Sequence, residues 1–68
     1  MVRYLMAEEP GQKPIFFWNW LGEYPKEGEL LFKAHFDGSP TTKYKITKVL
    51  GEGPDYKHYQ VERLKDGT

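Results

Sequence analysis

The sequence predicts an all-β domain, built as a small five-stranded antiparallel barrel or a strongly bent sheet. Glycine and proline recur at short intervals, and the pieces between them are rich in β-branched and aromatic residues, which is typical of strands joined by turns. The clearest strand signal is the strict alternation over residues 30–36, where Leu30, Phe32, Ala34 and Phe36 share one side. Five short strands cannot stay flat without leaving one face uncovered, so we expect the sheet to curl.

The individual strands follow from the same punctuation, and one segment has two interpretations. Residues 14–21 could form a short helical turn, with Pro14 at its first position and Gly22 just past its end. The aromatic residues of this segment favour a strand instead, because they are poor helix formers. We therefore expect strands at residues 2–7, 15–21, 29–36, 43–50 and 56–64.

The last two strands share a pattern that interrupts their alternation. Residues 44–49 read Tyr-x-Ile-x-x-Val and residues 59–64 read Tyr-x-Val-x-x-Leu, so each slips by one residue near its end. A β-bulge inserts one residue and would return the next side chain to the core face, whereas a strand that ends before the slip needs no bulge. Residues 25–64 are also similar, in pattern only, to a turn–strand–hairpin layout common in small barrels, and this likeness implies no function.

Size and composition indicate one domain, at residues 1–64, followed by a loose tail at 65–68. The chain has 68 residues, no cysteine and eleven aromatic residues (four Phe, two Trp and five Tyr). A chain of this length buries only about 60% of the surface that its unfolded form exposes. Because disulfides and thiolate metal sites are excluded, we expect aromatic packing to stabilise the core, and dimerisation stays open.

The neutral charge balance and the lack of a membrane span or secretory signal in the sequence lead us to expect a cytoplasmic protein with no membrane attachment. Ten basic residues balance ten acidic ones, whereas a dedicated nucleic-acid coat or membrane-surface protein would carry a basic excess. No apolar run approaches the ~20 residues of a membrane-spanning helix, and no apolar segment of a secretory signal follows the N-terminus.

The residues that could do chemistry do not form a catalytic or metal-binding pattern. Ser39 lies in a predicted turn. His35 with Asp37, or His58 with Asp55, could form an acid–base pair, but exposed histidines on strands are common and do not by themselves indicate catalysis. The spacings of metal-binding and phosphate-binding motifs are missing. We therefore expect no enzymatic activity and no cofactor.

The aromatic segment is the first candidate binding region. In a strand, Phe16, Trp18 and Trp20 would form one row, either exposed or covered by the N-terminal strand or a loop. Tryptophan and tyrosine are common anchors of protein interfaces, so Trp18, Trp20 and Tyr24 are candidate anchors for a protein partner.

Four lysines form the second candidate region. Lys43, Lys45, Lys48 and Lys57 lie near aromatic residues in the last two strands, and single-stranded nucleic acid binds to basic and aromatic side chains together. Alternating lysines also protect edge strands from aggregation. The sequence thus predicts a non-catalytic protein-interaction module, with nucleic-acid binding as the alternative.

Overall fold

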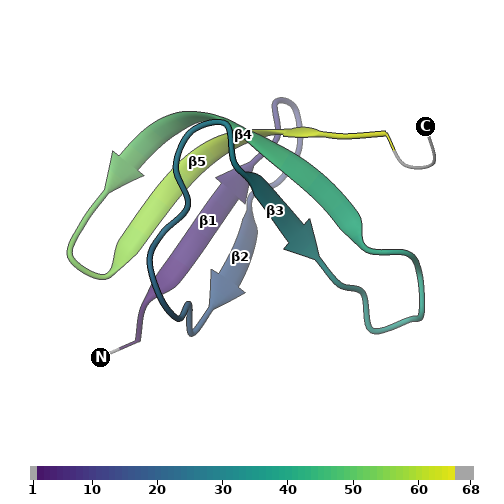
Figure 1. The fold of residues 1–68 in the computed structure, drawn as a ribbon, viewed down its shortest axis with the longest axis horizontal. Coiled ribbons are helices and arrows are strands. Elements are labelled where there is room, and N and C mark those ends of the chain that lie inside the picture. Colours follow the sequence, from purple (N-terminus) through teal and green to yellow (C-terminus); the bar gives the residue numbers. More distant parts are fainter. Residues whose placement is uncertain (1, 66–68) are drawn as a thin grey trace.

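Five strands form one sheet in the computed structural model, which describes residues 2–65 (Figure 1). The spatial order of the strands is β2-β1-β5-β4-β3. The described residues contain no helix, and therefore none that could cross a membrane. The strand interpretation of residues 14–21 is confirmed over residues 15–18. The strands are β1 (Tyr4–Glu8), β2 (Ile15–Trp18), β3 (Leu30–Lys33), β4 (Thr42–Glu52) and β5 (Tyr56–Arg63).

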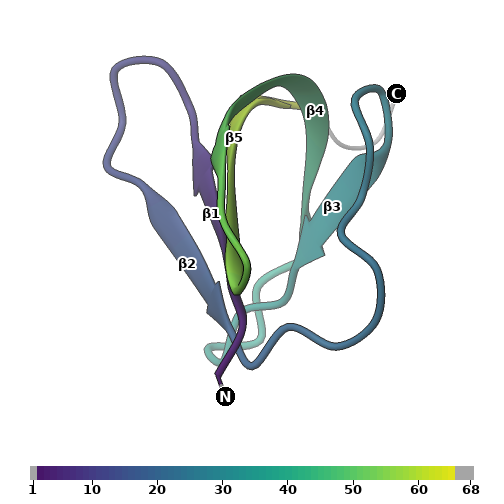
Figure 2. The same ribbon diagram turned by 90° about the vertical axis from the view of Figure 1, so that its left-hand side faces the viewer.

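The sheet curls through 255° into a half-barrel that stays open between its two edge strands, β2 and β3. Figure 2 shows β2 and β3 on opposite sides of the opening. The strongly bent sheet is therefore confirmed. The expectation that all strands pair antiparallel is wrong for one pair, because β1 and β5 run parallel while the other three pairs are antiparallel.

The phase slip has a different origin in each of the last two strands. In β4 it is a bulge: the pairing with β5 shifts register between Ile46 and Lys48, and again between Val49 and Gly51. Extra residues on one strand increase its local bend, which contributes to the curl of the sheet. In β5 the strand simply ends at Arg63, before the slip reaches Leu64.

The core lies on the concave side of the sheet, which we call the inner face. It consists of a few fully buried side chains, and half-buried aromatic residues pack against them. The convex side is called the outer face. The buried core residues are Leu5, Ala7, Leu31, Tyr44, Ile46, Tyr59 and Val61.

Strand β3 is shorter than the alternation predicted, and its apolar row faces outward. The strand ends at Lys33, and Phe36 lies beyond it, fully exposed. Within the strand Leu31 is the buried residue, because it is paired with Tyr44, whose ring lies in the core. Alternation then places Leu30 and Phe32 on the outer face.

The connection between β2 and β3 packs against the core through the partly buried rings of Trp20 and Tyr24. Its course changes at Asn19, whose φ of 58° is in the left-handed region. Two tyrosine hydroxyls help to attach the connection to the sheet: the Tyr24 hydroxyl donates to the carbonyl oxygen of Tyr4 (2.9 Å), and the Tyr59 hydroxyl donates to that of Pro25 (2.5 Å). Of the tail predicted at 65–68, residues 66–68 lie outside the described part of the chain.

Candidate functional site: an aromatic surface on the outer face

Four aromatic side chains from three strands meet on the outer face. The β1–β2 register sets Tyr4 opposite Trp18, and the parallel β1–β5 register sets Tyr4 opposite Tyr56. Tyr4 stacks on Tyr56 with ring centroids 5.6 Å apart, and it packs at a tilt against Trp18 at 5.2 Å. Phe16 stacks on Trp18 at 5.5 Å. We call this group, Tyr4, Phe16, Trp18 and Tyr56, the outer aromatic surface.

The two β2 rings of this surface are open to solvent. Trp18 is 63% exposed and Phe16 is 44% exposed, although both belong to a strand of the sheet. Their neighbours in the register extend the surface across the sheet, since Met6 lies opposite Phe16 on one side and opposite His58 on the other. The His58 Nε2 atom lies 3.1 Å from a carboxylate oxygen of Glu8, which makes a polar boundary for the apolar area. Exposed contiguous aromatic area of this kind is typical of interaction sites.

The structure separates the two tryptophans that the alternation had placed in one row. Because the chain turns at Asn19, Trp20 returns to the inner side, where its ring meets Phe17 edge-on with the centroids 6.1 Å apart. Trp20 also stacks on Tyr24 at 6.4 Å, and its Nε1 donates a hydrogen bond to the Glu23 carbonyl oxygen (3.2 Å). Of the three predicted anchors, only Trp18 is therefore on the outer face.

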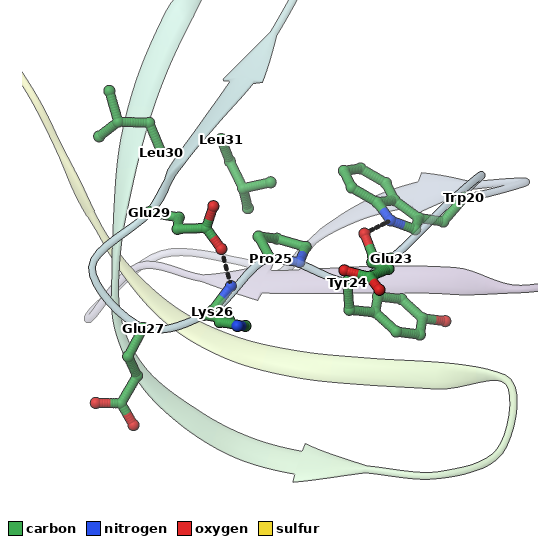
Figure 3. Close-up of a pocket in the computed structure, with 9 residues that line it drawn as sticks. All are labelled: Trp20, Glu23, Tyr24, Pro25, Lys26, Glu27, Glu29, Leu30 and Leu31. Carbon is green, nitrogen blue, oxygen red and sulfur yellow. Dashed lines mark hydrogen bonds between the residues drawn. The ribbon is translucent and has the colours of Figure 1, made fainter.

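Trp20 and Tyr24 line a shallow pocket of about 480 Å³ at the β2–β3 connection (Figure 3). Its lining includes Pro25 and Leu31, and carboxylates outnumber amines around it. One of these carboxylates is already engaged, because Glu29 accepts a hydrogen bond from the main-chain N–H of Lys26 and closes the turn there. The lining residues are Trp20, Glu23, Tyr24, Pro25, Lys26, Glu27, Glu29, Leu30 and Leu31.

Strand geometry divides the four predicted lysines between the two faces. Lys43 and Lys45 lie on the outer face of β4, opposite Phe32 and Leu30 of β3. Lys48 is exposed farther along the same strand. Lys57 instead points inward: its ammonium lies 5.8 Å from the centre of the buried Tyr59 ring and 3.5 Å from a Glu52 oxygen. The structure thus brings Lys43 and Lys45 together on the outer face and leaves Lys57 on the other side of the sheet.

The groups considered for catalysis are held in local structural contacts. Ser39 donates its main-chain N–H to the Asp37 carboxylate (2.9 Å), and hydrogen bonds from Ser39 hold the pKa of Asp37 below its usual value. This contact supports the turn interpretation of Ser39. The His35 Nε2 atom lies 2.7 Å from the Thr42 hydroxyl, and neither predicted histidine–aspartate pair is hydrogen-bonded within residues 2–65. The described residues contain no group of three or more potential ligands placed to hold a metal ion.

Two members of the outer aromatic surface were missed in the sequence. Alternation puts Tyr4 on the same side of the first predicted strand as Met6, and it puts Tyr56 on the opposite side of the last strand from Tyr59 and Val61. What the sequence lacks is any sign that β1 and β5, about fifty residues apart, lie side by side. That pairing is what joins Tyr56 to the aromatic residues of β1 and β2.

Comparison of the chain with models of protein families, with characterised proteins and with solved structures found no match.

Proposed function

We propose that this domain is a non-catalytic protein-interaction module that binds a protein partner through the outer aromatic surface. The observation that carries the proposal is the exposure of Phe16 and Trp18 beside Tyr4 and Tyr56. Rings at such a surface offer large contact area and lose little side-chain freedom on binding, which is why they dominate the energetics of interfaces. Half-buried Met6 adds a side chain that adapts to irregular surfaces.

The composition of the surface favours a protein partner over a nucleic acid. Binding of single strands needs basic side chains along the path of the stacked bases. The polar side chains beside these rings in the register are instead His58, opposite Met6, and its neighbour Glu8. A patch with an apolar centre and a polar rim is the usual arrangement of a protein interface.

The test compares two exposed aromatic residues on the same face. Trp18→Ala removes the most exposed ring of the outer aromatic surface, and Phe32→Ala removes a ring of similar exposure (56%) at the other edge of the sheet. A protein captured from extracts of the source cells is purified and titrated calorimetrically against the wild type and both variants. We expect Trp18→Ala to weaken binding at least ~30-fold, as for an interface anchor worth about 2 kcal/mol, and Phe32→Ala to leave it unchanged.

The control is the fold of each variant, measured as the amide NMR spectrum. A folded Trp18→Ala variant that binds as tightly as the wild type would refute the proposal. So would equal losses for Trp18→Ala and Phe32→Ala, because they would indicate binding that does not depend on this surface.

Nucleic-acid binding is the second candidate function, and one observation on β3 and β4 favours it. There Phe32 lies directly opposite Lys43, and Leu30 lies opposite Lys45, so a ring and two ammonium groups share the outer face. A mixed-sequence single-stranded oligonucleotide at low salt should then shift the amide signals of residues 30–33 and 42–48. No shift at millimolar concentration would rule this candidate out, and it would leave the protein-interaction proposal unaffected.

A further inference from the structure

The free edge of β2 has an unusual composition for an edge strand. Ile15, Phe16, Phe17 and Trp18 carry no charge, although natural sheets usually protect their edges with lysine, proline or a covering segment. The other edge strand, β3, contains Lys33 and lies beside Lys43 and Lys45. Figure 2 shows β2 at one side of the half-barrel, with β1 as its strand neighbour and β3 on the other side.

The main-chain groups that face this edge can be identified from two hydrogen bonds, one made by Tyr4 at the start of β1 and one by Arg3 just before it. Tyr4 N–H donates to the Asp55 carbonyl oxygen on the β5 side (3.0 Å), whereas Arg3 accepts from Trp20 N–H on the β2 side (2.8 Å). Successive strand residues direct their N–H and C=O groups to opposite sides, so Leu5 and Ala7 bond to β2. Their partners there are Phe17 and Ile15. Phe16 and Trp18 consequently direct their N–H and C=O groups to the open edge.

We infer that this edge pairs antiparallel with the β2 strand of a second copy of the chain, with Phe17 of the two copies facing each other across a twofold axis. In this register Phe16 of each copy faces Trp18 of the other. The four outward-directed residues, two from each copy, then form two hydrogen-bonded pairs, and all their edge-facing N–H and C=O groups are satisfied. The sheet becomes a continuous ten-stranded one.

The neighbouring symmetric registers would leave some of the edge-facing N–H and C=O groups without a partner. Centring the axis on Phe16 sets Trp18 opposite Pro14, which has no N–H to donate. Centring it on Trp18 sets Phe16 opposite Trp20, which lies beyond the turn at Asn19 and already donates its N–H to Arg3. A shift by one residue would place outer side chains against inner ones.

Charge also favours pairing of β2 with itself in the antiparallel direction. Residues 14–22 carry no charged side chain, and the first charges on either side are Lys13 and Glu23. Antiparallel pairing places the Lys13 end of one copy beside the Glu23 end of the other, so the charges that flank β2 in the sequence are opposite in sign where the copies meet. On the inner face the Lys33 ammonium of β3 lies 5.8 Å from the centre of the Phe17 ring. A parallel arrangement would set like charges together.

This inference does not depend on the proposed function, because edge pairing uses main-chain groups and leaves the faces of the rings accessible. On the outer face it would join two aromatic surfaces, with Phe16 of one copy next to Trp18 of the other. Cross-strand aromatic pairs of this kind stabilise sheets. The dimer would therefore present one surface of twice the size to a partner.

The first experiment measures the mass of the full chain in solution by sedimentation over a range of concentrations. We expect a reversible dimer, at twice the 8.0 kDa of the chain. A synthetic chain with N-methyl-Phe16 lacks one edge N–H but keeps every side chain, and we expect its dimer to be at least ~10-fold weaker. N-methylation of Phe32, on the free edge of β3, is the matched control and should have no effect.

The second experiment determines the register with single cysteines, since the chain has none of its own. Residues that face each other in a non-hydrogen-bonded antiparallel pair are about 4.5 Å apart at Cα, within the range of a disulfide. Phe17→Cys should therefore form a disulfide-linked dimer on oxidation. Because Phe17→Cys thins the core, a mixture of Phe16→Cys and Trp18→Cys chains serves as a second arm: the mixed disulfide should form, and neither variant alone should cross-link.

Three results would overturn the inference. The first is a chain that stays monomeric up to about 1 mM, where even a weak dimer would be populated. The second is growth into larger assemblies, which would indicate pairing of β2 with β3 of the next copy. The third is a dimer unaffected by N-methyl-Phe16. If partner binding is lost in Trp18→Ala while the N-methyl-Phe16 chain is monomeric and still binds, the two proposals are separated.

Discussion

Removing the hydroxyl of Tyr59 should destabilise the domain at neutral pH and cost much less at alkaline pH. The ring is fully buried, and its hydroxyl donates a hydrogen bond to the Pro25 carbonyl oxygen. Tyr59→Phe deletes this bond and leaves the carbonyl without its donor, for an expected loss of about 1–2 kcal/mol. The whole domain is expected to be stable by only ~3–10 kcal/mol, so the effect is readily measured.

The pH dependence follows from the ionisation of the same group. Burial, and to a smaller extent the nearby charges of Tyr24, Glu29 and Glu52, raise the pKa of Tyr59 to about 12 from the ordinary tyrosine value of 10.0. Because the folded-state pKa is the higher one, the stabilisation is fully present below about pH 9 and is lost as the pH rises toward 12. At about pH 11 the wild type should have lost roughly 1.4 kcal/mol through this group. The Phe variant cannot ionise there, so the difference between the two proteins should nearly vanish.

The assay is urea unfolding followed by tryptophan fluorescence, for both proteins at a series of pH values from about 7 to 11. Tyr24→Phe, which deletes a similar bond to the Tyr4 carbonyl oxygen, controls for the loss of a tyrosine hydroxyl at neutral pH. A difference between wild type and Tyr59→Phe that stays constant up to pH 11 would refute the reasoning. It would mean that Tyr59 ionises at the same pH in the folded and unfolded chains.

Two further substitutions test the local geometry between β2 and β3. Trp20→Ala should lower the free energy of unfolding by about 2–4 kcal/mol because it removes a half-buried ring and its hydrogen bond, whereas Trp18→Ala should lower it by ~1 kcal/mol or less. Equal losses for the two variants in urea unfolding would contradict the placement of the two rings. Asn19→Ala should lower the free energy of unfolding by roughly 1 kcal/mol because alanine disfavours the φ of 58°, and Asn19→Gly should be neutral or stabilising. If thermal unfolding shows that alanine is tolerated as well as glycine, residue 19 does not form a left-handed turn.

Much of the fold could be predicted from local signals in the sequence. Turn residues and β-branched or aromatic segments marked all five strands, and the bulge in β4 was one of two explanations offered for its phase slip. The boundaries were less accurate where a strand has no partner to extend it. The predicted strand 29–36 ends at Lys33 because β4, its only neighbour, begins at Thr42, directly opposite.

The candidate site was predicted less completely, for two physical reasons. One backbone angle at Asn19 redirects the chain, so Trp18 is exposed while Trp20 packs inside, and no alternation rule anticipates that turn. Similarly, alternation over residues 30–36 shows two sides of a strand without telling which is buried. That choice was made by the pairing of Leu31 with Tyr44.

The sequence by itself determined the class of the fold, the number of strands and the high aromatic content of a chain with a thin core. Those properties depend on backbone preferences and side-chain size, which act over a few residues. Only the tertiary structure decided which rings are exposed together and which edge is uncharged and open. The parallel pairing of β1 with β5 brings Tyr4 and Tyr56 together, and contacts between residues about fifty positions apart depend on how the whole chain buries its apolar surface.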